Sequence, residues 1–259
     1  LIAWFARLQM RSADPMLDLT LFRNTAISAG LLMAFVASGA MAGFELVLAQ
    51  ELQYVFGKTP LEAGVFMLPL IVASAISGPI AGALVGKLGL RLLAVAGLVT
   101  AGAALGCIAV TDIETHPLLT TAMLAMFGFS VGTALLASSV AIMGGASVER
   151  AGAAGSLETT GYELGAALGI TFFGVMLGWV YQSSFSVAGV APSSAAASSI
   201  GEAMVAAETM ATAQGAAIVA GAREAFGNAH AFVVGTASAL IIGLGLAVWV
   251  MLRVRPKEA

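Results

Sequence analysis

Two carboxylates, Glu158 and Glu163, stand inside the apolar stretch 156–182, which contains no lysine or arginine. A charged side chain near the middle of a lipid bilayer costs roughly 2.5–3.5 kcal/mol, so residues of this kind usually face a cavity and handle ions, protons or charged ligands. A carboxyl group in such a cavity can exchange a proton for a cation. These two acids are therefore the first candidates for a cation- or proton-binding site.

The spacing of the two acids separates their directions on a helix. Glu158 and Glu163 are five residues apart, which places them roughly 140° from one another around the helix axis. Glu158 aligns with Tyr162, whereas Glu163 aligns with Thr159 and does not share a narrow face with Glu158. One acid could line a substrate path while the other binds a proton. The alternative is that each carboxyl group hydrogen-bonds to a neighbouring helix and serves only to set the helix register.

Two further acids, Glu45 and Glu51, lie in or beside the first apolar stretch. Every lysine and arginine falls at the end of an apolar stretch or between two of them, so these acids have no basic partner at depth. We expect them to be protonated, to face a cavity, or to pair with a part of a longer protein, although a solvated helix face is the simpler alternative. Tyr162, Tyr54 and Phe172 could stack on a cation, or they could only pack.

The composition predicts an integral membrane protein. Hydrophobic residues make up 59% of the chain and charged residues 10%, with a mean hydropathy of +0.98, whereas soluble domains carry about one quarter charged residues. Six stretches are long enough to cross a bilayer as helices. We therefore expect an all-α, polytopic transmembrane bundle. The approximate spans are 26–48, 63–86, 92–110, 118–144, 156–182 and 231–252.

The basic residues predict the orientation of these spans. Nine of the eleven lysines and arginines fall on one side of the predicted membrane, and only Lys58 and Arg223 fall on the other. The positive-inside rule places the richer side, and with it both ends of the chain, in the cytoplasm.

One connection is long enough to hold structure of its own. Residues 183–229 are rich in alanine and serine, with apolar residues at four-residue spacing, and they predict a helical hairpin on the outer side rather than a disordered linker. The chain then divides into five parts. These are 1–24, read as the end of an upstream helix and a cytoplasmic loop, 25–182 with five spans, 183–229 with the hairpin, 230–252 with the last span, and a cytoplasmic tail at 253–259.

Enzyme chemistry finds little support in the sequence. The single cysteine, Cys107, excludes an internal disulfide and a cysteine-rich metal site. The two histidines, His116 and His230, are expected at the membrane interface. No catalytic constellation, metal-ligand spacing or phosphate-binding glycine loop appears, and no basic patch suggests nucleic acid. We predict no enzymatic activity, no metal and no cofactor.

Several segments resemble a known family. The run from Asp14 to Asn24, the segment Leu48 to Tyr54 and the segment Thr59 to Gly64 are similar to the C-terminal half of fourteen-helix drug:proton antiporters of the major facilitator superfamily. The resemblance covers nearly the whole chain. Glu149 to Gly152, followed by Glu158, Tyr162 and Glu163, resembles most closely the exporters of methyl viologen and quaternary ammonium compounds.

The resemblance also covers a loop motif. The segment from Gly82 through Lys87 and Gly89 to Arg91 is similar to the inner-loop motif of the superfamily, which implies a tight cytoplasmic turn that matters for conformational change. Gly86 stands where the motif usually has an aspartate. A charge latch based on that aspartate is therefore not expected in this half.

The resemblance implies a function and its setting. It implies an inner-membrane bacterial antiporter that expels lipophilic cationic drugs, takes its energy from the proton gradient, and works with a missing N-terminal half by rocking of two bundles within the lipid. The site residues that the resemblance implies are Glu158, Tyr162 and Glu163, and the unpaired acids Glu45 and Glu51 described above are added to them as candidates. Three alternatives remain: another transporter of the superfamily with a different small-molecule substrate, a membrane scaffold that does not transport, and an inactive truncated protein.

Overall fold

The chain folds into helices. The computed structural model describes residues 19–113, 115–191, 194–210 and 212–253, and every regular element within them is a helix. Six helices are long and apolar enough to cross a membrane, which confirms the predicted all-α bundle. They are α2 (Thr25–Gln50), continued by the π-helical stretch η2 (Glu51–Val55), α3 (Pro60–Leu88), α4 (Leu90–Val110), α5 (Pro117–Gly145), α6 (Ala151–Ser184) and α9 (Thr212–Met251).

Short elements complete the described chain. Two 3-10 turns, η1 (Leu19–Arg23) and η3 (Val148–Arg150), precede α2 and α6, and two short helices, α7 (Ala195–Ser198) and α8 (Ile200–Glu208), follow α6. The predictions made for 1–18 and for the end of the chain after residue 253 lie outside the described residues.

The ends of the helices follow from capping residues. The Asn24 side chain accepts a hydrogen bond from the Ala26 amide and donates one to the Gly145 carbonyl, so it caps α2 and holds it beside the end of α5. Thr59 and Glu62 form a capping box at the start of α3, which satisfies amides that the first helical turn leaves free. Gly89 separates α3 from α4 with a φ of +80°, a left-handed conformation that favours glycine.

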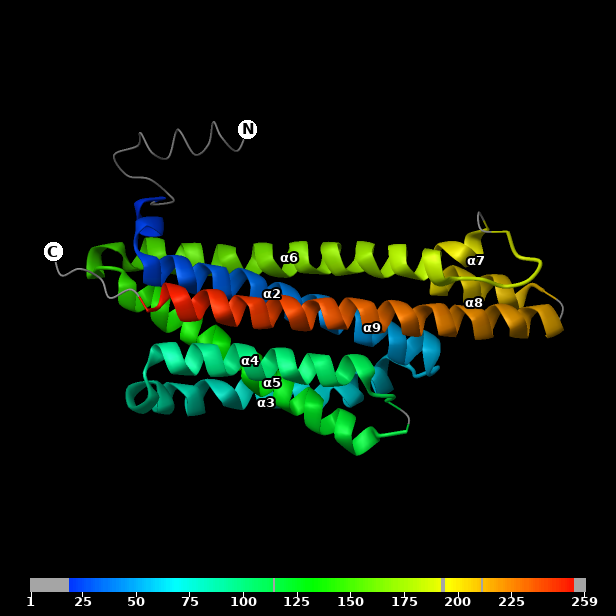
Figure 1. Ribbon diagram of the computed structural model, residues 1–259, viewed down its shortest axis with the longest axis horizontal. Helices are drawn as coiled ribbons and strands as arrows, with labels where there is room; N and C mark the ends of the chain where they lie inside the picture. The colour runs from blue at the N-terminus through cyan, green and yellow to red at the C-terminus, as the bar shows by residue number, and fades with distance from the viewer. Residues whose placement is uncertain (1–18, 114, 192–193, 211, 254–259) are drawn as a thin grey trace.

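The spanning helices form two groups of three. In Figure 1, α2, α6 and α9 lie together, and α3, α4 and α5 lie together below them. The groups meet where α4 packs against α9 and α5 packs against α2. Because α6 packs mainly on α2 and α3 packs mainly on α5, four helices follow one another in the order α6, α2, α5, α3.

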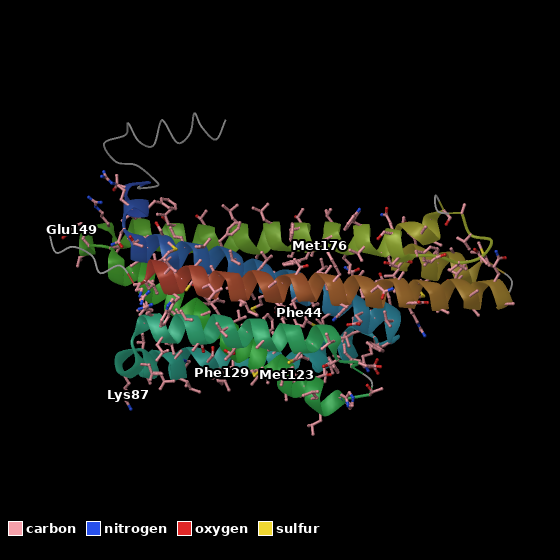
Figure 2. The ribbon with its side chains drawn as sticks, in the orientation of Figure 1. Phe44, Lys87, Met123, Phe129, Glu149 and Met176 are labelled. Atoms are coloured by element: carbon pink, nitrogen blue, oxygen red, sulfur yellow. The ribbon has the colours of Figure 1, made fainter. Side chains whose placement is uncertain are left out.

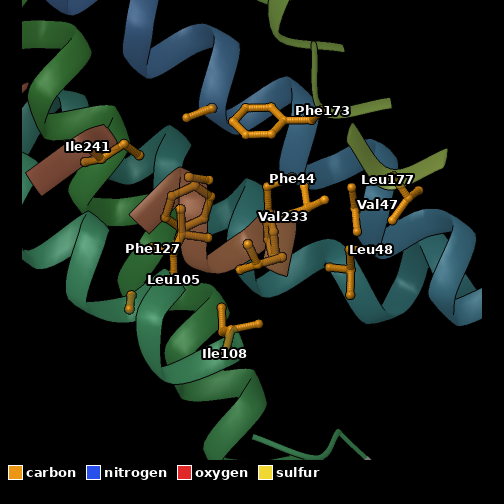
Figure 3. Close-up of a cluster of buried hydrophobic side chains, with 14 of the residues drawn as sticks. Phe44, Val47, Leu48, Leu105, Ile108, Phe127, Phe173, Leu177, Val233 and Ile241 are labelled. Carbon is orange, nitrogen blue, oxygen red and sulfur yellow. The ribbon is translucent and has the colours of Figure 1, made fainter. Parts of the chain in front are cut away.

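The core lies where the two groups meet. Figure 3 shows Phe44 of α2 beside Phe127 of α5, with ring centroids 5.1 Å apart in an edge-to-face arrangement. Val233 and Ile241 of α9 and Leu105 of α4 complete this apolar cluster. Aromatic pairs of this geometry contribute roughly 0.5–1.5 kcal/mol beyond their buried area.

The hairpin differs in one boundary from the prediction. α8 packs against the first part of α9, at the end of the bundle opposite the end of α9 (Figure 1). However, α9 is one continuous helix of 40 residues, so the second arm and the last span are not separate elements divided at residue 230. The apolar stripe through Ile218, Ala222 and Phe226 is buried and continues to Val233, and no helix-breaking proline interrupts α9.

Candidate functional site

An open groove crosses the row of four helices within their apolar length. Its volume is about 540 Å³, and it lies between α6 on one side and α3 on the other, over α2 and α5. No lysine, arginine or histidine is among the described residues that line it. The lining residues are Ser38 of α2, Gly78 of α3, Gly132, Leu135, Leu136 and Ser139 of α5, and Glu158, Tyr162, Glu163 and Ala166 of α6.

The groove brings together the two acids of α6 that the sequence singled out. Glu158 is half-buried and Glu163 is exposed, and both line the groove with Tyr162 between them around the helix. The roughly 140° that separates the acids argued against a shared narrow face. Both nevertheless reach the same space because the groove is broad and open along α6.

Tyr162 connects the acids to the neighbouring helix. Its hydroxyl lies 3.0 Å from Oε1 of Glu158 and 3.1 Å from the carbonyl oxygen of Leu135 on α5. The backbone carbonyl of Tyr162 accepts a hydrogen bond of 3.0 Å from the hydroxyl of Ser38 on α2. The middle of α6 is thus tied by polar contacts to both α5 and α2.

Glycines allow α6 to lie close against α2. A Cβ atom added at Gly165 would overlap the carbonyl oxygen of Phe35, and one added at Gly169 would overlap the backbone of Gly39. In lipid, where apolar side chains gain little by leaving their surroundings, such small residues let helices approach and gain van der Waals contact. The acids of α6 therefore stand on a helix whose position is closely defined.

Glu45 stands apart from the groove. It is half-buried on α2 and lies two turns beyond Ser38 on the same face, roughly 10 Å along the axis. It is not part of the groove lining. Tyr54 and Phe172 are exposed and also lie outside the lining, so Tyr162 is the aromatic side chain of the groove.

Glu51 is in a different environment from the groove acids. It opens the π-helical stretch η2, is buried, and its Oε2 lies 2.8 Å from Nδ1 of His230 on α9. The side chains of His230 and Glu51 are only 7% and 10% exposed. Within the described structure neither of these two atoms has a hydrogen-bond partner, so the contact between them is a close approach of two polar groups without hydrogen-bond geometry.

The Glu51–His230 contact differs from one expectation. Glu51 does not lie on a solvated helix face, because it is buried against His230. The signal for His230 was present in the sequence, since it lies four residues after Phe226 on the apolar stripe of α9. No pattern indicated that Glu51 would be its partner.

The inner-loop motif forms the turn between α3 and α4 without the aspartate that is usual at the position of Gly86. Gly82 and Lys87 are exposed on α3, and Gly89 forms the turn; Figure 2 shows Lys87 at the end of the bundle where this turn lies. The Arg91 guanidinium stacks 3.5 Å from the centre of the Trp249 ring and its Nε donates to the Trp249 carbonyl at 3.1 Å. A stacking contact to α9 thus holds the start of α4.

The chain is similar to known drug-resistance proteins. It is 43% identical over 252 residues to the methyl viologen resistance protein SmvA of Salmonella typhimurium, an alignment that covers 96% of this chain and 51% of the relative. It is 33% identical to the multidrug efflux pump LfrA of Mycolicibacterium smegmatis, over 97% of this chain and 50% of the relative. The multidrug resistance protein Stp of Mycobacterium tuberculosis is 32% identical over 69% of this chain and 33% of its own length.

The comparisons bear on several predictions. No family profile matches the chain, but the relatives above confirm the predicted resemblance to multidrug exporters of the major facilitator superfamily. Their names describe efflux and resistance proteins and not enzymes, in agreement with the prediction. The chain spans about half the length of the curated relatives it matches most fully.

Proposed function

We infer that this chain belongs to the drug exporters of the major facilitator superfamily and forms the C-terminal half of one of them. The similarity extends over nearly the whole chain but over about half of SmvA and of LfrA. The six membrane-spanning helices form one bundle. Transport by alternating access uses two such bundles that rock around a site near the middle of the membrane. The other bundle is therefore the first partner we propose.

The activity that we propose is export of lipophilic and quaternary ammonium cations, methyl viologen among them, in exchange for protons. The observation that carries this proposal is the groove, where Glu158, Tyr162 and Glu163 meet with no basic side chain among the described residues that line it. An anionic substrate would call for a basic residue there. A cation would find two carboxylates and the face of an aromatic ring.

The cation and the proton compete for the same carboxylates, and this competition couples export of the cation to entry of protons. Two unit charges 4 Å apart attract by about 4 kcal/mol in surroundings of intermediate polarity, before the cost of removing water is subtracted. A proton bound to the carboxyl group removes that attraction. Deprotonation on the inner side therefore favours binding of the cation, and protonation on the outer side favours its release.

The orientation that we propose places the hairpin of α8 and α9 outside. The bacterial inner membrane is the expected location, with both ends of the chain in the cytoplasm, because most basic residues gather at that end of the bundle. In the full-length protein with Cys107 replaced by alanine, a cysteine at the exposed position Ser198 of α7 should react with an impermeant thiol reagent in intact cells. A cysteine at the exposed position Ser147 should not, and the reverse pattern would overturn the orientation.

Efflux by the full-length protein tests the proposed activity. Glu158→Gln and Glu163→Gln keep the shape of each side chain and its capacity to form hydrogen bonds, and they remove its charge. In cells that lack related exporters, each variant should reach the membrane at the normal level while methyl viologen efflux falls to the background level. Glu202→Gln, an exposed acid on α8, is the matched control and should transport normally. Unchanged efflux by both groove variants would refute the assignment of the site.

Expression of the 259-residue chain alone provides a second test. If the site needs two bundles, this chain should give no resistance to methyl viologen, and co-expression with the natural first half should restore it. Resistance from the chain alone would contradict the two-bundle proposal. A full-length protein that exports a different small molecule, or none, would favour the alternatives of another substrate or an inactive form.

A further inference from the structure

The hydroxyl of Tyr162 lies between the acceptors Glu158 and Leu135, and the side chain of Ser138 on α5 is a further hydrogen-bonding partner. The Ser138 hydroxyl donates its own hydrogen to the carbonyl of Gly30. Oε1 of Glu158 is 3.0 Å away and the carbonyl oxygen of Leu135 is 3.1 Å away. A phenol carries a single hydrogen, so it donates to one of them at a time. A carboxylate and a carbonyl carry no hydrogen of their own, and both contacts can therefore be hydrogen bonds at once only when Glu158 is protonated.

Two arrangements follow from this count of hydrogens. With Glu158 protonated, its carboxyl group donates to the oxygen of Tyr162, and the Tyr162 hydroxyl donates to the carbonyl of Leu135. With Glu158 ionised, the Tyr162 hydroxyl turns to the carboxylate and leaves the carbonyl of Leu135. One proton departs from Glu158 into the groove, and the phenol keeps its own hydrogen throughout.

We propose that Glu158 is the group that carries the exchanged proton, and that Tyr162 is a positioning residue that transmits the protonation state of Glu158 from α6 to α5. The proposal rests on the proposed antiport and assigns its proton site. When Glu158 binds a proton, a hydrogen-bonded chain joins the two helices. When Glu158 loses it, the link to Leu135 is released and the carboxylate is free to attract a cation.

The other acid of the groove is suited to the cation. Glu163 is exposed, and no hydrogen bond ties it to another described residue, whereas Glu158 is half-buried and in contact with Tyr162. An exposed carboxylate can contact a large cation without losing an internal partner. Glu163 therefore supplies the attraction for substrate that persists while Glu158 changes its protonation state.

Few other titratable groups face Glu158. α5 and α3 contribute glycine, leucine and serine to the groove, and α2 contributes Ser38. Glu163 shares the groove, and Glu45 lies further along α2. The protonation state of Glu158 therefore decides whether the Tyr162 hydroxyl donates to Leu135 or to Glu158. Glu163 is the charged neighbour on the same helix.

Infrared titration of the full-length protein without drug tests the assignment directly. The difference between the wild type and Glu158→Gln isolates the protonated carboxyl band of Glu158, which should disappear as the pH rises. In Tyr162→Phe the protonated carboxyl group of Glu158 loses the acceptor of its hydrogen bond, so the frequency of its band should rise.

Tyr181→Phe is the matched control. Tyr181 lies on the same helix and donates to the carbonyl of Ala196, away from the acids, so its loss should leave the Glu158 band unchanged. An unaltered frequency of the Glu158 band in Tyr162→Phe would overturn the proposal, as would a pH-dependent carboxyl band that belongs to Glu163 and not to Glu158.

A second measurement distinguishes failure of this proposal from failure of the proposed function. Methyl viologen added to the wild type at a pH where Glu158 is protonated should remove the Glu158 band. If the band responds to Tyr162→Phe but not to methyl viologen, the hydrogen-bonded link is supported and the proposed substrate is wrong.

Discussion

The groove of α6 and the contact between η2 and α9 hold acids in opposite situations. In the groove, Glu158 and Glu163 stand beside open space with no basic side chain among the described lining residues. At the other location, Glu51 is buried and lies 2.8 Å from His230. A carboxylate that exchanges ligands must be accessible and incompletely satisfied, whereas a buried carboxylate with a close partner is fixed in place. Acids at depth in a membrane bundle are therefore not equivalent, and their surroundings decide their role.

The two locations also differ in how the backbone presents the acid. α6 is a regular helix through both groove acids, and its glycines bring it close to α2. At Glu51 the helix widens into a π-helical stretch, a rare local departure from the α-helix. The groove acids thus stand on a regular helix and the buried acid on an irregular one.

The largest effect on stability is expected at the buried pair. Glu51→Ala in the full-length protein should lower the free energy of unfolding by about 3–5 kcal/mol, because the partner is left buried without a counterpart. The double substitution Glu51→Leu with His230→Leu should recover most of that loss. Unfolding by heat or denaturant in detergent measures both. If Glu51→Ala is as stable as the wild type, the pair is not the structural contact proposed here.

A smaller effect is expected where α6 packs on α2. Gly169→Ala should cost about 1–3 kcal/mol, because the added methyl group meets the backbone of Gly39. It should also weaken cation binding by shifting the groove acids. Gly178→Ala on the same helix has open space at its Cβ and should be neutral or stabilise the helix by up to about 1 kcal/mol. Equal stabilities of the two variants would contradict the close packing of α6 on α2.

A still smaller effect is expected at the loop motif. Arg91→Lys removes the planar group that stacks on Trp249 and should cost about 0.5–1 kcal/mol. In a variant that already carries Trp249→Leu, the same substitution should have little further effect on the unfolding temperature. Additive losses from the two changes would show that the stacking does not connect α4 to α9.

The smallest effect on stability is expected in the groove itself. Glu163→Gln changes an exposed side chain, so its free energy of unfolding should stay within about 0.5 kcal/mol of the wild type. Transport should nevertheless be lost. A large loss of stability in this variant would place Glu163 with Glu51 as a structural acid and would remove the contrast between the two locations.

The sequence predicted the elements better than their contacts. Six spans, the helical nature of 194–210 and the start of α9, and the acids of α6 follow from local patterns of apolar residues, capping residues and charge. The pairing of Glu51 with His230 joins residues 179 positions apart, and no local pattern encodes it. The shared groove was missed for a related reason: helix spacing gives directions on one helix, whereas α2, α3 and α5 determine how wide the space beside it is.

Proton release on binding of methyl viologen tests the central claim most directly. Purified full-length protein in weakly buffered solution should release protons when methyl viologen is added, because the cation displaces them from the groove. The double variant Glu158→Gln with Glu163→Gln should release none, while Glu51→Gln, which keeps a hydrogen-bonding side chain beside His230, should release as many as the wild type. Proton release that persists in the double groove variant, or that is lost only in Glu51→Gln, would contradict the assignment of proton exchange to Glu158 and Glu163 of α6.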